Sequence, residues 1–264
     1  MILSRRVALN GAELDQIDRR ILVSGIEEAA PKFTQTTSAR MGIDGARMTV
    51  DRRDNLDVTV KFGIKIRRDD MEARSELLEQ VTAWAMAGGW LTVGHRPGRR
   101  LRVICSQAPA PGDQYAWNSD YSVTFRALGV PYWQQEDPNS FSISATRASE
   151  RALEVGGTAP SVLELSLSNT SGSTLDDFSL SAAGSTMAFR GLGLANGETL
   201  ELDHTDDGIL RIRIRSAAGA WRSAMVKRTA ASADELVVRP GSVPVSWVCK
   251  RAGTLVVRCF GRYY

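Results

Sequence analysis

Residues 57–67 read DVTVKFGIKIR, in which apolar and polar side chains alternate without a break. Successive side chains of a strand point to opposite faces of a sheet, so this alternation predicts a strand with one buried and one polar face. Residues 71–87 then read MEARSELLEQVTAWAMA, in which apolar side chains recur at helical spacing. This change of period predicts an antiparallel sheet with one amphipathic helix inserted between its strands and packed on it.

The predicted helix carries chemical signals at both of its ends. Asp69 lies three residues before Glu72, the spacing of a capping box in which aspartate replaces the usual serine or threonine. Gly88 and Gly89 follow the apolar stripe, and glycine tolerates the left-handed backbone that ends many helices. The sequence therefore predicts a capped helix over residues 70–87.

Strand-like segments precede the long strand and resume after the helix. They cover residues 21–23 and 47–50 before it, and residues 90–93, 101–104 and 121–127 after it. A proline- and glycine-rich stretch separates the last two segments and predicts an exposed loop. The helix is thus expected between strands of one domain.

The length of 264 residues suits two domains of ordinary size. The chain turns polar after Trp133, so we place the first domain at 1–134, a linker at 135–140 and the second domain at 141–264. Short alternating runs fill the second domain, and turn residues separate them at fairly regular intervals, which is typical of an antiparallel sandwich. The predicted fold class is mainly β with one helix: an N-terminal β-sandwich domain that contains the α-helix, then a C-terminal β-sandwich.

The composition excludes several classes of protein. It is 43% hydrophobic and 24% charged, which is ordinary for a folded protein, and no window approaches the roughly 18 apolar residues of a membrane span. We expect no signal peptide, no membrane insertion and folding in a cytoplasm. The 33 basic and 30 acidic residues give a net charge of only +3, too little to indicate nucleic-acid binding. Three cysteines form no CxxC pair and are expected as buried thiols.

No constellation of residues indicates catalysis. The two histidines, His95 and His204, fall in different predicted domains, which argues against a shared triad or a bis-histidine metal site. Residues 203–208, DHTDDG, resemble the start of a calcium loop, but the twelfth position is Ile214, so a hairpin turn explains them better. The glycine-rich residues 191–197 precede no helix that could bind a phosphate. We expect no enzyme activity, no metal and no cofactor.

A few polar and aromatic residues remain as candidates for an interface. Arginine pairs recur beside acidic residues, as solvated strand ends or contacts between subunits would require. Trp117 lies in a polar stretch, and an exposed aromatic residue on a structural protein usually marks an interface. The candidate interface residues are Arg52, Arg53, Arg67, Arg68 and Trp117.

The order of these features resembles the ring-forming domain of siphophage distal tail proteins. The resemblance rests on the N-terminal strand region, the alternating strand 56–67, the capped helix 70–87 and the closing run FRALGVPYW at 125–133. In the second half, four segments look like the galectin-like domain of the same family. They are residues 162–169, 187–201, 238–242 and 255–264.

The resemblance implies a concrete assembly. Members of that family form a hexameric ring whose N-terminal domains build a central belt and whose galectin-like domains lie outside. Such a ring would bind the tail-tube protein on one face and a tail-associated hub or fibre protein on the other, at the virion tail tip. DNA would pass through the opening without sequence-specific binding, and assembly would take place in the host cytoplasm. No inserted carbohydrate-binding module is evident, which weakens any claim of sugar binding.

Three alternatives stay open from the sequence. The all-β second half could be a lectin-like carbohydrate-binding adsorption module, which requires an exposed aromatic residue flanked by polar groups. The chain could be another minor structural tail protein, which gene neighbourhood would distinguish. An enzyme of unrecognised type would require a base and a nucleophile that the sequence does not offer.

Overall fold

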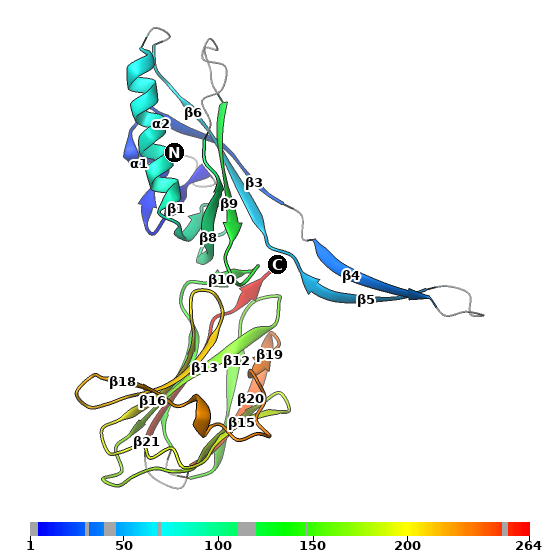
Figure 1. Cartoon of the computed structure of the whole chain (residues 1–264), viewed down its shortest axis with the longest axis vertical. Helices are drawn as coiled ribbons and strands as arrows, with labels where there is room; N and C mark the ends of the chain where they lie inside the picture. The colour runs from blue at the N-terminus through cyan, green and yellow to red at the C-terminus, as the bar shows by residue number, and fades with distance from the viewer. Residues whose placement is uncertain are drawn as a thin grey trace. The chain divides into compact units, whose positions relative to one another are not determined.

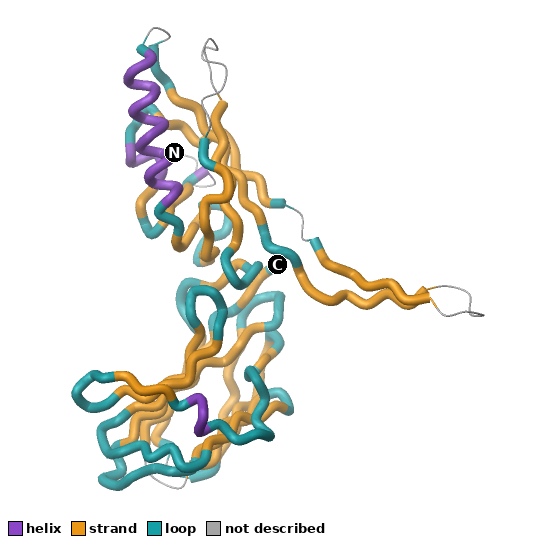
Figure 2. Tube along the Cα trace, viewed as in Figure 1, coloured by secondary structure: helices purple, strands orange, loops and turns teal. Residues whose placement is uncertain are grey.

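The computed structural model describes residues 5–29, 32–39, 46–67, 70–109, 120–145, 147–249 and 253–264. The chain forms two compact units, Met1–Trp133 and Gln134–Tyr264. Strands dominate both units, so the prediction of a mainly β protein with one substantial helix is confirmed (Figures 1 and 2). No described helix is long and apolar enough to cross a bilayer.

Unit 1 is built on one antiparallel sheet with the strand order β2-β1-β7-β8-β9-β6-β3. The strands are β1 (Val7–Leu9), β2 (Ala12–Glu13), β3 (Ile21–Glu28), β6 (Asp57–Ile64), β7 (Gly89–Val93), β8 (Arg99–Gln107) and β9 (Asp120–Ala127). A short helix, α1 (Leu14–Ile17), follows β2, and a three-residue strand, β10 (Trp133–Gln135), follows the sheet. The polar–apolar alternation of residues 57–64 thus forms a strand in the interior of this sheet, between β9 and β3.

The long strand β6 is shorter than the alternation in the sequence predicts. Val58, Val60 and Phe62 are fully buried, as the alternation predicts, but β6 ends at Ile64 and not at residue 67. Ile66 is only half-buried. The alternation extends past the last residue that pairs with a neighbouring strand, because β3 begins at Ile21, opposite Ile64.

The helix α2 (Met71–Met86) packs its apolar stripe on the sheet, and Trp84 meets Phe125 of β9 edge to face at 5.7 Å between ring centroids. The predicted N-cap was wrong by one residue: Asp70, not Asp69, accepts the backbone N–H of Ala73. Asp69 itself lies outside the described residues. The C-terminal prediction is confirmed, since Gly88 follows the helix with a φ of 59°.

Among the residues that the structure describes, strands β4 (Phe33–Ala39) and β5 (Ala46–Arg53) pair only with each other and form a separate two-stranded sheet. The pair is drawn as a ribbon that leaves the main sheet of unit 1 between β3 and β6 (Figure 1). Sequence patterning predicted part of β5 but not β4. The sequence of β4, FTQTTSA, lacks the apolar alternation that marks a buried strand.

Unit 2 is a sandwich of two antiparallel sheets. One has the order β11-β21-β13-β16-β17-β18, with β19 also paired to β13, and the other has the order β12-β20-β14-β15. Leucine, valine and phenylalanine from both sheets share one buried core. The strands are β11 (Asn139–Ser144), β12 (Ser149–Val155), β13 (Ser161–Asn169), β14 (Phe178–Ala182), β15 (Ser185–Phe189), β16 (Thr199–His204), β17 (Leu210–Arg215), β18 (Trp221–Ser223), β19 (Val237–Val238), β20 (Gly241–Cys249), β21 (Gly253–Cys259) and β22 (Arg262–Tyr263). A 3₁₀ turn, η2 (Met225–Lys227), follows β18.

Candidate interface site

The candidate interface residues are only partly brought together. Arg53 lies at the end of β5, half-buried, and Arg52 precedes it in the same strand. Arg67 is exposed and lies beyond the end of β6. Arg68 and Trp117 lie outside the described residues. The structure therefore directs attention to Arg53 and its surroundings at the base of the β4–β5 hairpin.

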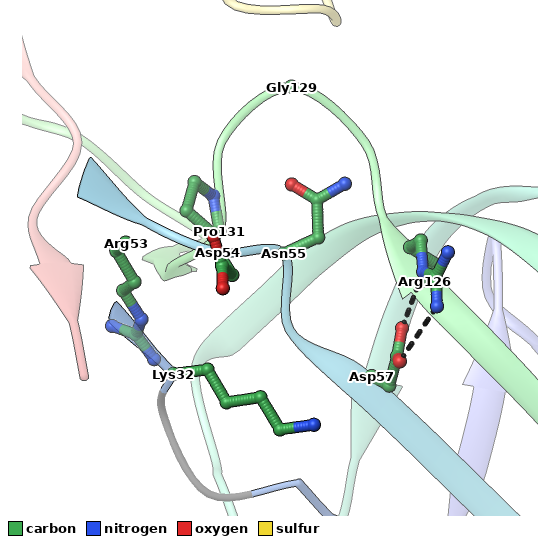
Figure 3. Close-up of a pocket in the computed structure, with 8 residues that line it drawn as sticks. All are labelled: Lys32, Arg53, Asp54, Asn55, Asp57, Arg126, Gly129 and Pro131. Atoms are coloured by element: carbon green, nitrogen blue, oxygen red, sulfur yellow. Dashed lines mark hydrogen bonds and ion pairs between the residues drawn. The ribbon is translucent and has the colours of Figure 1, made fainter. Parts of the chain in front are cut away.

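A pocket of about 550 Å³ opens at this base, and Figure 3 shows the residues that line it. They come from the residue before β4, the end of β5, the β5–β6 connection, the start of β6, the end of β9 and the segment that follows β9. The lining residues are Lys32, Arg53, Asp54, Asn55, Asp57, Arg126, Gly129 and Pro131. Charged and amide groups dominate, so the pocket suits polar groups and not an apolar ligand.

The charged groups that line this hairpin-base pocket differ in whether they form an ion pair or a hydrogen bond. Arg126 donates two hydrogen bonds to Asp57 at 2.8 and 3.0 Å (Figure 3). Asp54 accepts from the Thr34 hydroxyl at 2.8 Å, which fixes the hairpin to its own base. Lys32 is exposed and, within the described part of the chain, forms no ion pair. The pocket thus offers an ammonium group and the Asn55 amide to an incoming acidic group.

Arg53 of this pocket also contacts an aromatic ring. Its guanidinium carbon lies 4.7 Å from the centroid of the Tyr132 ring, within the range of a cation–π contact. Tyr132 belongs to the closing PYW stretch that follows β9. The contact therefore links the hairpin to the end of unit 1, although 79 positions separate the two residues in the numbering.

A second cluster fixes the end of β3, just before the hairpin begins. Glu28 accepts hydrogen bonds from Arg96 Nε and Nη2, both at 2.7 Å, and from Trp133 Nε1 at 3.2 Å. His95 Nε2 lies 2.6 Å from the same carboxylate. The Arg96 guanidinium also lies 5.3 Å from the Trp133 ring centroid. One carboxylate thus joins β3, the β7–β8 turn and the closing stretch.

The environment of Glu28 favours its charged form. Burial raises the pKa of this carboxyl group, but the hydrogen bonds from Arg96, His95 and Trp133 outweigh burial and hold its pKa below the ordinary 4.5. Glu28 is therefore an ion-pairing residue and not a proton donor near neutral pH. No local signal could reveal this cluster, since Glu28 and His95 are 67 residues apart.

The face of the unit 1 sheet opposite to α2 is polar. The cross-strand pair Thr59 and Thr124 is joined by a hydroxyl hydrogen bond at 3.1 Å, and Lys61 pairs with Glu27 on the neighbouring strand. These side chains alternate with the buried ones of β6, so they point away from the helix. The sheet thus has an apolar face under α2 and a mainly hydrophilic opposite face, on which Leu22 and Ile104 are also exposed.

The candidate calcium segment in unit 2 is a turn held by arginines. Gly208 N–H bonds to the Thr205 carbonyl at 2.8 Å, and Gly208 has a φ of 78°. Asp203 accepts from Arg211 and Arg213, at 2.7 and 3.0 Å, so its carboxylate is already neutralised. Within the described residues, no group of histidine, cysteine and acidic side chains has the arrangement of a metal site.

An exposed tryptophan in unit 2 was not singled out from the sequence. Trp221 of β18 is 45% exposed, and Arg213 of β17 lies 3.8 Å from its ring centroid. Arg215 lies 5.7 Å from the same ring. Its sequence context, AAGAWRS, carries no local signal that separates an exposed edge residue from a core residue.

No family model and no curated protein matches the sequence. Solved structures do match the fold. The crystal structure of SPP1 Dit (gp 19.1), described as a paradigm of the hub adsorption apparatus in phages that infect Gram-positive bacteria, superposes with a TM-score of 0.69. That match has 10% identity and covers 98% of this chain and 99% of the other.

Two phage p2 baseplate structures in the activated conformation, with Sr and with Ca, match with TM-scores of 0.47 and 0.42. Their identities are 9% and 7%, and they cover 96% and 90% of this chain and 97% and 90% of theirs. The likeness to SPP1 Dit extends over both units. At the level of fold, the chain therefore matches a siphophage distal tail protein along almost its whole length.

Proposed function

We propose that the protein is the distal tail protein of a siphophage-like tail, a structural component and not an enzyme. The observation that carries the proposal is the likeness to SPP1 Dit over 98% of this chain and 99% of that protein. A match that covers both units in the same order along the chain is more specific than a match of one β-sandwich. A β-sandwich by itself occurs in proteins with many different functions. Location at the virion tail tip, after assembly in a host cytoplasm, belongs to the same proposal.

The proposed assembly is a hexameric ring, and the β4–β5 hairpin supports it. An isolated two-stranded sheet is at best marginally stable in water, because it buries too little apolar surface to offset the loss of chain entropy. Phe33 at its base is 43% exposed. A second copy of the chain that packs on the hairpin would supply the missing contacts, and a head-to-tail contact repeated around an axis closes a ring. Arg52, Arg53, Arg67, Arg68 and Trp117 remain the proposed interface residues.

The polar face of the unit 1 sheet supports a channel through the ring. Thr59, Lys61 and Thr124 present hydroxyl and ammonium groups on this face, beside the exposed side chains of Leu22 and Ile104. A wall of this kind lets DNA pass without reading its sequence. The proposed partners are the tail-tube protein on one face of the ring and a hub or fibre protein on the other. The second unit, proposed as galectin-like, would lie at the periphery.

Negative-stain electron microscopy and analytical ultracentrifugation of the full chain test the ring. We expect sixfold rings at high protein concentration and low salt, and dissociation as salt screens the polar contacts between subunits. Replacing residues 33–53 by a short glycine–serine linker should leave a folded monomer that no longer assembles. A protein that stays monomeric at high concentration, even with its tail-tube partner, would contradict the ring.

A lectin-like role is the second candidate, and Trp221 is the observation that favours it. An exposed indole beside two arginines fits the requirement for an aromatic residue flanked by polar groups. Binding to a glycan array that is lost in Trp221→Ala, but not in the buried-core control Leu200→Val, would support this role. Absence of any glycan binding would remove it.

A further inference from the structure

The sheet β12-β20-β14-β15 of unit 2 has a free edge at β12 (Ser149–Val155). Within the described chain, this strand pairs with β20 on one side and with no strand on the other. A strand edge of seven residues presents unpaired backbone groups and is a template for another strand.

The register fixes the direction of the backbone groups. Ala152 lies opposite Pro244, which has no N–H, so this pair cannot exchange the two hydrogen bonds of a bonded antiparallel pair. Glu154, two residues on, accepts a hydrogen bond at its carbonyl from the Asn139 side chain at 2.7 Å, again on the side away from β20. Alternate residues face the same side, so the N–H and C=O groups of Glu150 and Ala152 point outward.

A groove of about 350 Å³ adjoins this part of the edge. The half-buried Ile143 and the edge of Trp247, which is only 4% exposed, supply a small apolar surface, and polar side chains from β11, the β11–β12 turn and β12 form the rim. The rim residues are Ser144, Arg147, Ser149, Glu150 and Arg151. The Trp247 ring packs on Phe141 with centroids 6.1 Å apart, so its position is fixed by the core. The groove can take one apolar side chain from an incoming strand.

The rim carries a charge that the described chain does not neutralise. Arg147 and Arg151 are exposed, and neither forms an ion pair with any described residue. Arg151 lies over the Phe141 ring at 5.3 Å, which holds its guanidinium beside the groove. The lining holds one carboxylate, that of Glu150, against these two guanidinium groups. An acidic group on the occupant complements this rim.

We propose that β12 is a docking edge for an extended, acidic peptide segment of a partner protein, which joins the sheet as a fifth strand. Backbone groups of Glu150 and Ala152 bond the segment, and one aliphatic side chain enters the groove over Trp247. A carboxylate of the segment bonds the two arginines. Main-chain bonds provide affinity and the groove provides specificity, as in other cases of strand addition. The site lies within unit 2 and does not depend on ring formation.

The probe is a capped heptapeptide of alternating valine and threonine with one central glutamate. Titration into the full-length protein is followed by nuclear magnetic resonance of the backbone amides. We expect saturable shifts and slowed hydrogen exchange at Glu150 and Ala152, and shifts at the Trp247 indole. A peptide with lysine in place of the glutamate should bind about tenfold more weakly, the size of one lost charge-assisted contact.

The first control modifies the peptide and leaves the protein unchanged. N-methylation of the peptide amides that face β12 removes hydrogen bonds and should abolish binding, whereas methylation of the alternate amides should leave affinity within about twofold.

Ala152→Pro should also abolish binding, because proline lacks the outward N–H while no bond to β20 is lost. Arg147→Gln with Arg151→Gln should weaken binding, and Arg190→Gln, an exposed arginine elsewhere on unit 2, should not.

Four results would overturn the proposal. Equal affinity of the two methylated peptides would show that no strand forms, and so would full binding to a folded Ala152→Pro protein. Slowed exchange at Glu150 and Ala152 that depends only on protein concentration would assign the edge to a second copy. Shifts at Trp247 with a soluble oligosaccharide, and none with the peptide, would make the groove a sugar site.

Discussion

The β4–β5 pair and the β6–β9 pair of unit 1 have the same extent but different support. Each aligns seven residues of one strand with seven of the other. In β6–β9 one face is buried, with Val60 and Phe125 fully inaccessible, whereas Phe33 in the hairpin is 43% exposed. Strand pairing alone exchanges hydrogen bonds with water for bonds in the sheet at little net gain. Apolar burial, about 25 cal/mol per Å², therefore distinguishes a self-supporting sheet from one that needs a partner.

The largest expected effect comes from removing a buried ring on the supported side. Phe125→Ala should lower the free energy of unfolding by about 3 to 5 kcal/mol, because it leaves a cavity under α2 next to Trp84. The matched hairpin variant, Phe33→Ala, should change the unfolding of the monomer by less than about 0.5 kcal/mol. Urea denaturation of both measures the contrast. A similar loss in both variants would mean that the hairpin belongs to the folding core.

The next effect concerns Glu28, the last residue of β3, which lies just before the β4–β5 hairpin. Glu28→Ala should cost about 2 to 3 kcal/mol, because Arg96 and Trp133 lose a partly buried acceptor at the base of the hairpin. Glu27→Ala is the control, since its carboxylate pairs with Lys61 in solvent and should contribute less than about 1 kcal/mol. If both variants unfold alike, the Glu28 cluster does not stabilise unit 1.

The pH dependence of the Glu28 contribution has a defined sign. Its folded pKa lies below 4.5, so the stabilisation is fully present above the unfolded value and is lost as pH falls through the folded value. The difference in stability between the native protein and Glu28→Gln should therefore shrink as pH falls from about 5 toward 3. Urea midpoints across this range measure it. A difference that grows between pH 5 and 3 would contradict the ion-pair assignment.

A smaller effect is expected where one side chain joins β1 to the end of α2. Asn10, with a φ of 51°, accepts from the Trp90 N–H at 2.9 Å and donates to the Gly88 carbonyl at 2.8 Å. Asn10→Ala should cost about 1 to 2 kcal/mol through the lost bonds and the strained backbone, whereas Asn10→Gly should cost less because glycine tolerates this φ. Thermal unfolding compares them. An equal loss would exclude backbone strain as a contributor.

The smallest effect tests a purely local element. Asp70→Ala should cost about 1 kcal/mol because it removes the cap at the Ala73 N–H, and Asp70→Asn should retain most of the stability. Helical circular dichroism during unfolding measures the change. If Asp70→Ala is neutral, water replaces the cap without loss.

Periodicity predicted β6 and α2 because both have one buried face, which imposes a repeat on the sequence. It extended β6 past Ile64 because the alternation continues after the pairing ends. The cap was placed on Asp69 because two adjacent aspartates precede the helix, and only backbone geometry distinguishes them. Strand β4 was missed because a strand without a buried face carries no such repeat.

The candidate site was less predictable than the fold. Arg53 was named for its charge, but its contact with Tyr132 and its place in the hairpin-base pocket depend on long-range folding. The Glu28 cluster, Trp221 and the free edge of β12 were not anticipated. Each depends on which strand lies beside which, and the local sequence does not encode that neighbour.

The sequence by itself determined the mainly β class, the single substantial helix and its glycine stop, because these depend on local periodicity and backbone preference. Tertiary structure alone decided that β4 and β5 form a separate sheet, that Glu28 meets Arg96 and Trp133, and that β12 has an open edge. Contacts of this kind join residues far apart in the chain. Their energy comes from burial and hydrogen bonding that exist only once the chain has folded.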